Sequence, residues 1–162
     1  MSSLQPLKSL NNCKLRKFIL VVEDSDEDFT ALERMLKRIK AKVNIYRVCD
    51  GEEALDYLYR QKDYTDPENF PRPSVILLDL NLPGTDGREV IKQVKEDDAL
   101  KAIPIVVLTT SANPQDIQDC YLHGANSYML KPMGVEELRY TIEDFLHYWL
   151  DAVILPYSVD DQ

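Results

Sequence analysis

The feature that most constrains this sequence is an alternation of short apolar runs with segments whose apolar residues recur at helical spacing. Between the first two runs, for example, Leu32, Leu36 and Ile39 lie three or four positions apart, as on one face of a helix. Strands that alternate with helices indicate a parallel sheet wrapped by helices. The sequence therefore predicts a doubly wound α/β domain with helices on both faces of the sheet. The five predicted strands lie at residues 18–22, 43–48, 75–79, 105–108 and 127–130.

Helix starts and loops are marked by polar residues and prolines. Ser25 with Asp28 three residues later resembles a capping box, and Asn113-Pro114 is a favourable helix start. Residues 60–73 are polar and contain three prolines, so they are expected to form a long connecting loop. We interpret this loop as an insertion within one domain.

The length and the cysteine content indicate a single domain without disulfides or zinc. A chain of 162 residues fits one domain of ordinary size. We divide it into an N-terminal extension at 1–16, the domain at 17–149 and a C-terminal tail at 150–162. The cysteines are odd in number and far apart, so buried or free thiols are expected. They are Cys13, Cys49 and Cys120.

The charge and the hydropathy exclude several classes of function. With 28 acidic and 19 basic residues the net charge is −9, which repels phosphate backbones and argues against direct nucleic-acid binding. The longest apolar runs have the length of strands, so no membrane-spanning segment is expected. The N-terminus up to Lys17 lacks the apolar stretch of a secretory signal. A cytoplasmic location is the expectation.

Polar side chains follow four of the five predicted strands. In open α/β sheets ligands bind beyond the carboxyl ends of the strands, so these side chains are expected to lie together. Several carboxylates at one edge repel one another unless a cation lies among them. Oxygen ligands without histidine or cysteine select Mg²⁺ or Mn²⁺. The residues are Glu23 and Asp24 after the first strand, Asp79 as the last residue of the third, Thr109 after the fourth and Lys131 after the fifth.

Given a metal, Asp79 could act as a nucleophile toward phosphorus. The cation and the Lys131 ammonium would neutralise charge on the phosphoryl oxygens, and the Thr109 hydroxyl could donate to one of them. Each residue alone has a simpler explanation: a helix-capping acid, a turn former, a strand residue or a solvated charge. These separate explanations do not account for the occurrence of all these residues together at the ends of four strands.

Four segments resemble, in order and spacing, the receiver domain of two-component response regulators. The resemblance covers residues 17–149 and implies a flavodoxin-like fold with strand order 2-1-3-4-5. It implies that Asp79 is the phosphoacceptor and that the protein is a signalling phosphoacceptor with at most slow self-phosphorylation and self-dephosphorylation. The segments are Ile19-Leu-Val-Val-Glu-Asp24, Val75-Ile-Leu-Leu-Asp-Leu-Asn-Leu-Pro-Gly84, Ile105-Val-Val-Leu-Thr-Thr-Ser111 and Tyr128-Met-Leu-Lys-Pro132.

The same resemblance implies roles for further residues. Magnesium would be held by Asp24, Asp79 and the Asn81 carbonyl, with Glu23 helping through water; many receivers have aspartate in place of Glu23. Thr109 and Tyr128 would form the switch pair, and Lys131 would contact the phosphoryl group. Asn81 and Ser111 would influence the lifetime of the phosphorylated form. The Lys131–Pro132 bond would be cis.

A closer similarity is to the stand-alone regulators that partner phytochrome-type histidine kinases. It rests on the proline-containing loop before the third strand, on residues 100–111 and 120–128, and on Tyr148-Trp149-Leu150. The similarity implies a phytochrome-class histidine kinase as the partner.

Two other classes of function remain as alternatives. A flavin carrier or an aspartate-nucleophile phosphatase could share the fold, but no GxGxxG or phosphate-binding loop follows a strand. Such phosphatases have a second aspartate where Asn81 stands. A binding module that is not phosphorylated is the other alternative. The joint presence of Asp24, Asp79, Thr109 and Lys131 weighs against it.

The end of the chain is rich in apolar residues. They exceed the roughly 100° stripe that one helix normally buries against its own sheet. We therefore expect a homodimer through the final helix and the tail, because two-fold dimers are the commonest oligomers. The alternative is a tail that folds back over its own domain. The residues are Phe145, Leu146, Tyr148, Trp149, Leu150, Val153, Ile154 and Leu155.

Overall fold

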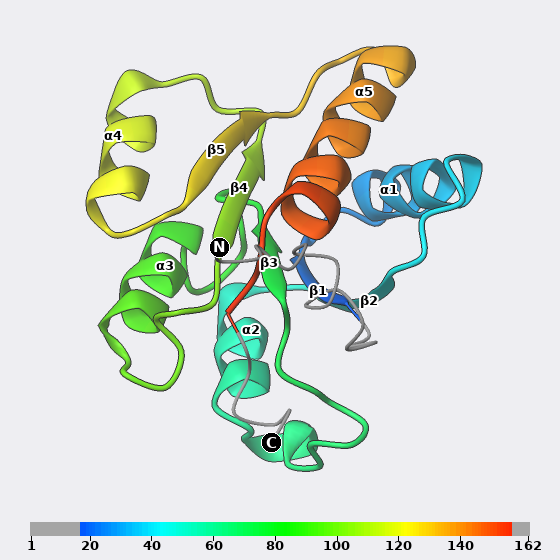
Figure 1. Cartoon of the computed structure of the whole chain (residues 1–162). Helices are drawn as coiled ribbons and strands as arrows, with labels where there is room; N and C mark the ends of the chain where they lie inside the picture. The colour runs from blue at the N-terminus through cyan, green and yellow to red at the C-terminus, as the bar shows by residue number, and fades with distance from the viewer. Residues whose placement is uncertain (1–16, 157–162) are drawn as a thin grey trace, which may run out of the picture.

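The computed structural model describes residues 17–156, which form one five-stranded parallel sheet (Figure 1). The strand order is β2-β1-β3-β4-β5, and every neighbouring pair is parallel. This confirms the predicted fold class and strand order. The strands are β1 Phe18–Val22, β2 Asn44–Val48, β3 Val75–Leu78, β4 Ile105–Thr109 and β5 Ser127–Leu130.

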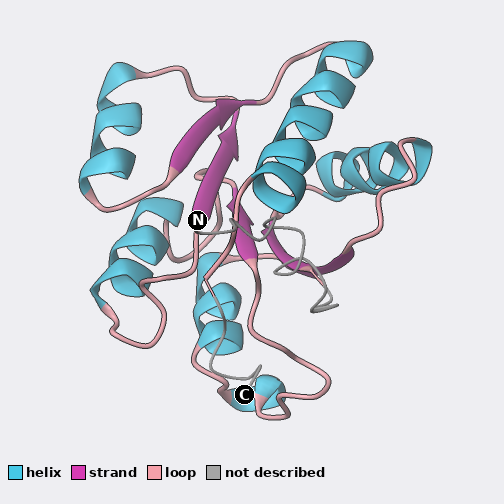
Figure 2. Ribbon diagram, in the orientation of Figure 1, coloured by secondary structure: helices cyan, strands magenta, loops and turns pink. Residues whose placement is uncertain are grey.

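Helices cover both faces of the sheet (Figure 2). Helices α1 and α5 lie together over one face, whereas α2, α3 and α4 follow one another over the other. A π-helical segment, His147–Ala152, continues α5, and a 3-10 turn, Lys62–Tyr64, interrupts the loop predicted before β3. The helices are α1 Asp26–Arg38, α2 Gly51–Leu58, α3 Gly87–Glu96, α4 Pro114–Leu122 and α5 Val135–Leu146.

The core consists of two apolar layers separated by the sheet. Successive strand residues point to opposite faces. Ile76 and Leu78 of β3 accordingly belong to the layer under α2, α3 and α4, whereas Val75 and Leu77 belong to the layer under α1 and α5. All four residues of β3 are buried, as expected for a central parallel strand covered on both faces.

The predicted helix starts are confirmed. Ser25 caps α1, where its Oγ accepts a hydrogen bond from the Asp28 backbone N–H at 3.2 Å. Asn113 caps α4 and is followed by Pro114 at the first helical position. Helix α1 therefore begins directly after the acidic residues that follow β1.

The long loop before β3 is held by aromatic packing. The rings of Tyr64 and Phe70 lie edge to face with centroids 5.0 Å apart, and Tyr46 and Tyr57 complete the cluster. The Tyr57 hydroxyl also donates to the Pro71 carbonyl at 2.8 Å. The insertion is thus packed against the domain.

The end of the described chain folds back on its own domain. Phe145, Leu146 and Leu150 are buried among residues of α1 and the sheet, and Trp149 and Leu155 pack against the same layer. Tyr148 and Ile154 remain 54% and 75% exposed. Most of the apolar surface from which a dimer was expected is therefore used within the chain. Residues 157–162 of the proposed tail lie outside the described residues.

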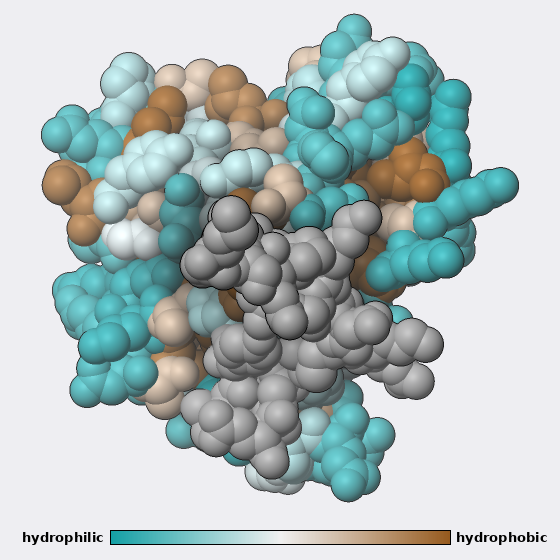
Figure 3. Space-filling view, in the orientation of Figure 1, coloured by the Kyte–Doolittle hydropathy of each residue, from teal (hydrophilic) through white to brown (hydrophobic). Residues whose placement is uncertain are grey.

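The described surface carries many charged groups, and the described cysteines are free thiols, as the composition predicts. Among the coloured residues of the face seen in Figure 3, hydrophilic surface predominates and smaller hydrophobic patches lie between the hydrophilic groups. Cys120 is buried and Cys49 is exposed, both as free thiols, whereas Cys13 lies outside the described residues. Within residues 17–156, no helix is both long enough and apolar enough to cross a membrane.

Candidate functional site

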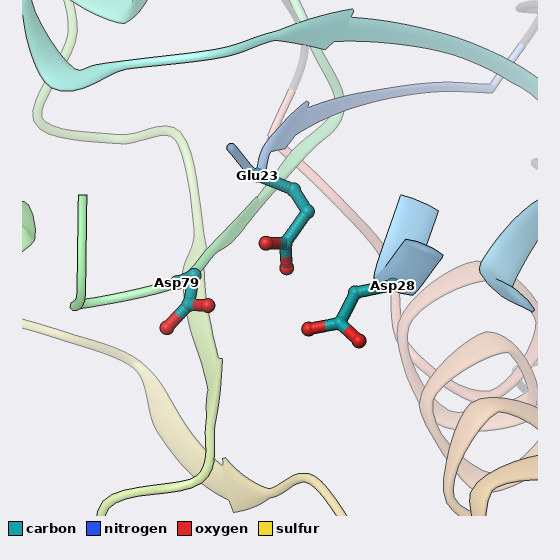
Figure 4. Close-up of side chains that lie close together, drawn as sticks. All are labelled: Glu23, Asp28 and Asp79. Carbon is teal, nitrogen blue, oxygen red and sulfur yellow. The ribbon is translucent and has the colours of Figure 1, made fainter. Parts of the chain in front are cut away.

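The carboxyl edge of the sheet brings three acidic side chains together (Figure 4). Glu23 follows β1, Asp79 follows β3, and Asp28 lies in the first turn of α1. One carboxylate oxygen from each lies within 4.8 Å of the others. The three carboxyl groups point into one shared space, because parallel strands end at the same edge and α1 begins beside it.

The backbone fixes Asp79 in place. Its N–H donates to the Val22 carbonyl of β1 at 3.0 Å. Helix α3 begins so close to it that a Cβ on Gly87 would lie 2.6 Å from the Asp79 carbonyl oxygen. Only glycine permits this approach without a backbone shift. Asp79 is therefore held by β1 on one side and by α3 on the other.

Lys131, the first residue after β5, lies among the three carboxylates. Its Nζ is 2.8 Å from Asp79 Oδ2, 2.5 Å from Glu23 Oε2 and 3.0 Å from Asp28 Oδ2. Its backbone N–H donates to the Thr109 carbonyl at 2.8 Å, which fixes the start of the side chain. The predicted meeting of Asp79, Glu23 and Lys131 at this edge is therefore present.

Burial and ion pairing act in opposite directions on these groups. Burial by itself would lower the pKa of Lys131, but hydrogen bonds to Asp79 and Glu23 outweigh it, so the pKa is raised and the ammonium stays charged. Burial also raises the pKa of Glu23, although the hydrogen bond from Lys131 acts against this rise. One ammonium thus forms ion pairs with the almost fully buried carboxylates of Glu23 and Asp79 and with the half-exposed carboxylate of Asp28.

The donor set fits a hard divalent cation. All three acidic residues offer oxygen, the ligand atom preferred by Mg²⁺ and Mn²⁺. Three carboxylates and one ammonium leave a formal charge of −3 + 1 = −2, which a divalent ion would balance. The fit therefore rests on charge as well as on ligand chemistry.

Asp28 replaces Asp24 in the observed cluster. Asp24 is exposed and is not one of the three grouped residues, although the resemblance implies it as a ligand. Asp28 was expected to be a helix-capping residue, because it lies three positions after Ser25. The Asp28 backbone N–H does bond the Ser25 cap, but its carboxylate is directed to Lys131. The side chain was missed because a capping pattern already accounted for it.

Asn81 contacts Asp79 directly, whereas Thr109 at the end of β4 and Tyr128 in β5 are connected to each other through Ser111. The Asn81 N–H donates to Asp79 Oδ1 at 3.3 Å, so both Asp79 oxygens have partners. Thr109 is buried at the end of β4. Its Oγ1 accepts a long hydrogen bond of 3.5 Å from the Ser111 N–H, and the Tyr128 hydroxyl donates to the Ser111 carbonyl at 2.8 Å. Ser111 therefore connects the two predicted switch residues.

The peptide bond before Pro132 is trans, which corrects the expectation of a cis bond. Residues 17–156 contain no cis peptide bond. Bonds before proline favour trans by about 0.5–1 kcal/mol. Lys131 reaches all three carboxylates with the trans bond, so the observed contacts do not require the cis form.

An apolar cavity of about 360 Å³ extends from the acidic cluster between α1 and α5. Asp28 and Lys131 lie at its polar end. The deeper walls are apolar side chains from both helices and the sheet, among them Leu32, Leu77, Leu108, Leu138 and Ile142. The cavity therefore joins the acidic edge to apolar side chains of α1, α5 and the sheet.

Comparison with known proteins gives a consistent result. The chain is 41% identical over 140 residues to response regulator Rcp1 of Synechocystis, covering 86% of this chain and 93% of that protein. The crystal structure of the Mn²⁺-bound form of Rcp1 superposes with a TM-score of 0.80 at 40% identity, covering 87% and 99% of the two chains. That of the phosphorylated cyanobacterial phytochrome response regulator RcpA gives a TM-score of 0.82 at 38% identity and coverage of 88% and 99%.

The family assignment follows from the fold, the acidic edge and these likenesses. The sequence pattern of the response regulator receiver domain matches residues 19–143, which include all but the first residue of the five strands and most of α5. The family is one of signalling domains that accept phosphoryl groups. The chain belongs to the response regulator receiver domain family.

Proposed function

We propose that Asp79 accepts a phosphoryl group from a histidine kinase and that the domain relays this event through a conformational switch. The observation that carries the proposal is the position of the Asp79 carboxylate. It is nearly buried, it lies 2.8 Å from the Lys131 ammonium, and it is grouped with Glu23 and Asp28. The nucleophile and the cation that would offset phosphoryl charge are therefore adjacent.

The chemistry needs few protein groups. An oxygen of Asp79 attacks phosphorus, the bond from phosphorus to the donor nitrogen or oxygen breaks, and the leaving group keeps that electron pair. Lys131 neutralises charge on the transferred oxygens, and the Thr109 hydroxyl donates to one of them. The product is an acyl phosphate on Asp79.

We further propose that a divalent cation is held at this edge. Glu23, Asp28 and Asp79 are the grouped oxygen donors, and the family resemblance adds Asp24 and the Asn81 carbonyl. When bound, Mg²⁺ or Mn²⁺ offsets the negative charge that accumulates where phosphate meets carboxylate. The Mn²⁺-bound form of Rcp1 supports this proposal.

The switch is proposed to involve Thr109 and Tyr128. Phosphorylation would draw the Thr109 hydroxyl toward the phosphoryl group and bias an existing equilibrium of the Tyr128 ring. Asn81 and Ser111, which flank the acceptor, are proposed to influence the lifetime of the phosphorylated form. Support comes from the bonds of Ser111 to both switch residues and of the Asn81 N–H to Asp79.

Asp79→Asn should abolish phosphorylation, because the amide lacks the nucleophilic oxygen pair of the carboxylate. The measurement is intact mass after incubation with a small acyl phosphate and Mg²⁺. A gain of one phosphoryl mass is expected for the parent and none for the variant or for the parent with a chelator. Labelling of the variant at the parental level would show that another residue accepts the group.

Asp28→Asn should weaken Mn²⁺ binding. Removing one negative charge close to the other ligands is expected to cost on the order of 1 kcal/mol, or about fivefold in affinity. Titration calorimetry of the parent and the variant measures this. Glu27→Gln is the matched control, because Glu27 is an exposed acid on the same turn of α1 but is not one of the three grouped ligands. Equal losses in both variants would remove Asp28 from the proposed ligands.

We propose a phytochrome-class histidine kinase as the phosphoryl donor, in the cytoplasm. The proposal is supported by the likeness to RcpA, which is a phytochrome response regulator. Transfer from such a kinase should be about tenfold faster or more than transfer from an unrelated one, because a matched surface raises the population of productive complexes. Transfer of radiolabelled phosphate to the parent, with Asp79→Asn as the control, measures the ratio. Equal rates would contradict the pairing.

We also propose a homodimer, now through the exposed apolar residues of the C-terminal segment. Phe145 and Leu150 are part of the core, so Tyr148 and Ile154 are the accessible members of the predicted interface. Sedimentation at high micromolar concentration should give a dimer for the parent and a monomer for Tyr148→Ser with Ile154→Ser, because apolar contact area is lost. Leu122→Ser, which changes a 74% exposed residue on α4, is the control and should remain dimeric. A monomeric parent would contradict the proposal.

A further inference from the structure

A chain of polar contacts connects the start of α3 with the loop after β4, outside the acidic cluster. Asp86 caps α3, and its Oδ2 accepts from Arg88 Nη2 at 2.8 Å. The other end of the guanidinium, Nη1, donates to Asp116 Oδ1 on α4 at 2.6 Å. Asp116 Oδ2 accepts from Ser111 Oγ at 2.7 Å. One guanidinium thus joins the loop after Asp79 to the loop after Thr109.

Ser111 is the residue at which this chain meets the switch pair. Its Oγ bonds Asp116, its carbonyl accepts from the Tyr128 hydroxyl, and its N–H donates to Thr109 Oγ1. All three polar atoms of Ser111 are engaged. A movement of Thr109 can reach Tyr128 through this residue, and the position of Ser111 depends on Asp116.

The Asp116 carboxylate binds groups outside α4 instead of capping its own helix. It is the third residue of α4, where an acidic side chain often accepts from the N–H of the N-cap residue. Here the Asn113 N–H instead donates to Ser111 Oγ at 3.3 Å. The Asp116 carboxylate contacts Arg88 and Ser111.

The Arg88–Asp116 pair is also better shielded than a typical surface pair. Its side chains are 31% and 24% exposed, against 55% and 52% for Arg38 and Glu136, which join α1 to α5. Shielded pairs are screened less by water and salt. Arg88 therefore holds the Asp116 carboxylate, and through it Ser111, more firmly than an exposed pair would.

We propose that Arg88 and Asp116 are positioning residues for the switch. By fixing Ser111 they keep its carbonyl within hydrogen-bond distance of the Tyr128 hydroxyl. They thereby set how strongly a movement of Thr109 alters the orientation of the Tyr128 ring. The inference rests on the proposed function, in which Thr109 and Tyr128 form the switch pair. Loss of either residue shifts the Tyr128 equilibrium and leaves the nucleophile and its cation at Asp79 and Lys131 in place.

The test uses NMR of protein with isotope-labelled tyrosine, first without a phosphodonor. In Arg88→Ala and Asp116→Asn the chemical shifts of the Tyr128 ring should move from the parental values toward those of a solvent-exposed tyrosine ring that samples several orientations. Ser111→Ala keeps the ion pair but removes its link to the loop, and it should move the signals in the same direction. Arg38→Ala, which removes the other interhelical pair at 3.1 Å, should leave them at the parental position.

A second measurement follows phosphorylation. Intact mass should show that Arg88→Ala and Asp116→Asn take one phosphoryl group, as the parent and Arg38→Ala do. The amide shifts that phosphorylation causes in α4 should fall by about twofold or more in the two variants alone. This fall separates a positioning role from a general loss of helix packing, because Arg38→Ala also removes an interhelical pair.

The outcomes distinguish the inference from the function on which it rests. Parental Tyr128 signals in Arg88→Ala, Asp116→Asn and Ser111→Ala would overturn the positioning role, even with normal phosphorylation. Failure of the parent to take phosphate would overturn the proposed function, whereas the ring signals without donor would still decide the positioning role. If circular dichroism shows that Arg88→Ala does not fold, the Tyr128 signals of Asp116→Asn and Ser111→Ala decide whether the positioning role holds.

Discussion

The carboxyl edge of this sheet depends on one partly buried ammonium group. Lys131 Nζ contacts carboxylates that come from the end of β1, the end of β3 and the first turn of α1. Without it, like charges at these separations would repel by about 1 kcal/mol in water and by more at a partly buried edge. Lys131 therefore holds three elements together, yet it neutralises only part of their charge. The remaining negative charge is what makes the edge attractive to a divalent cation.

The electrostatic arrangement works only because the backbone is fixed around it. Asp79 is tied to Val22 by a backbone hydrogen bond and is approached by α3 at Gly87, where no side chain would fit. Lys131 is tied to the Thr109 carbonyl. Both charged groups are thus carried on strand ends with little freedom, which is what a site that stabilises a phosphoryl group needs.

The sequence predicted the fold and most of the edge, because strand order and strand-end chemistry follow from local patterns. It placed Asp79, Glu23, Thr109 and Lys131 at one edge. It did not place Asp28, because the capping pattern gave its carboxylate an expected role at the start of α1, whereas that carboxylate contacts Lys131. It did not predict where Leu150 and Leu155 pack, because an apolar residue can pack on its own core or on a partner. The contacts with the layer under α1 and α5 that decide this are tertiary contacts, which a local sequence pattern does not show.

Two polar networks meet at Thr109: the acidic cluster, and the chain of contacts from Arg88 through Asp116 to Ser111. The acidic cluster reaches Thr109 through Lys131, whose backbone N–H binds the Thr109 carbonyl, and the Arg88–Asp116 chain reaches it through Ser111. In the first network three carboxylates share one ammonium, whereas in the second one guanidinium contacts two carboxylates. In the proposed function, a phosphoryl group on Asp79 would add charge to the first network and draw the Thr109 hydroxyl toward it, so the long contact between Thr109 and the Ser111 N–H would be the first to change. Because Asp116, held by Arg88, would still bind Ser111 Oγ, the proposed switch would transmit this change through the Ser111 carbonyl to the Tyr128 hydroxyl.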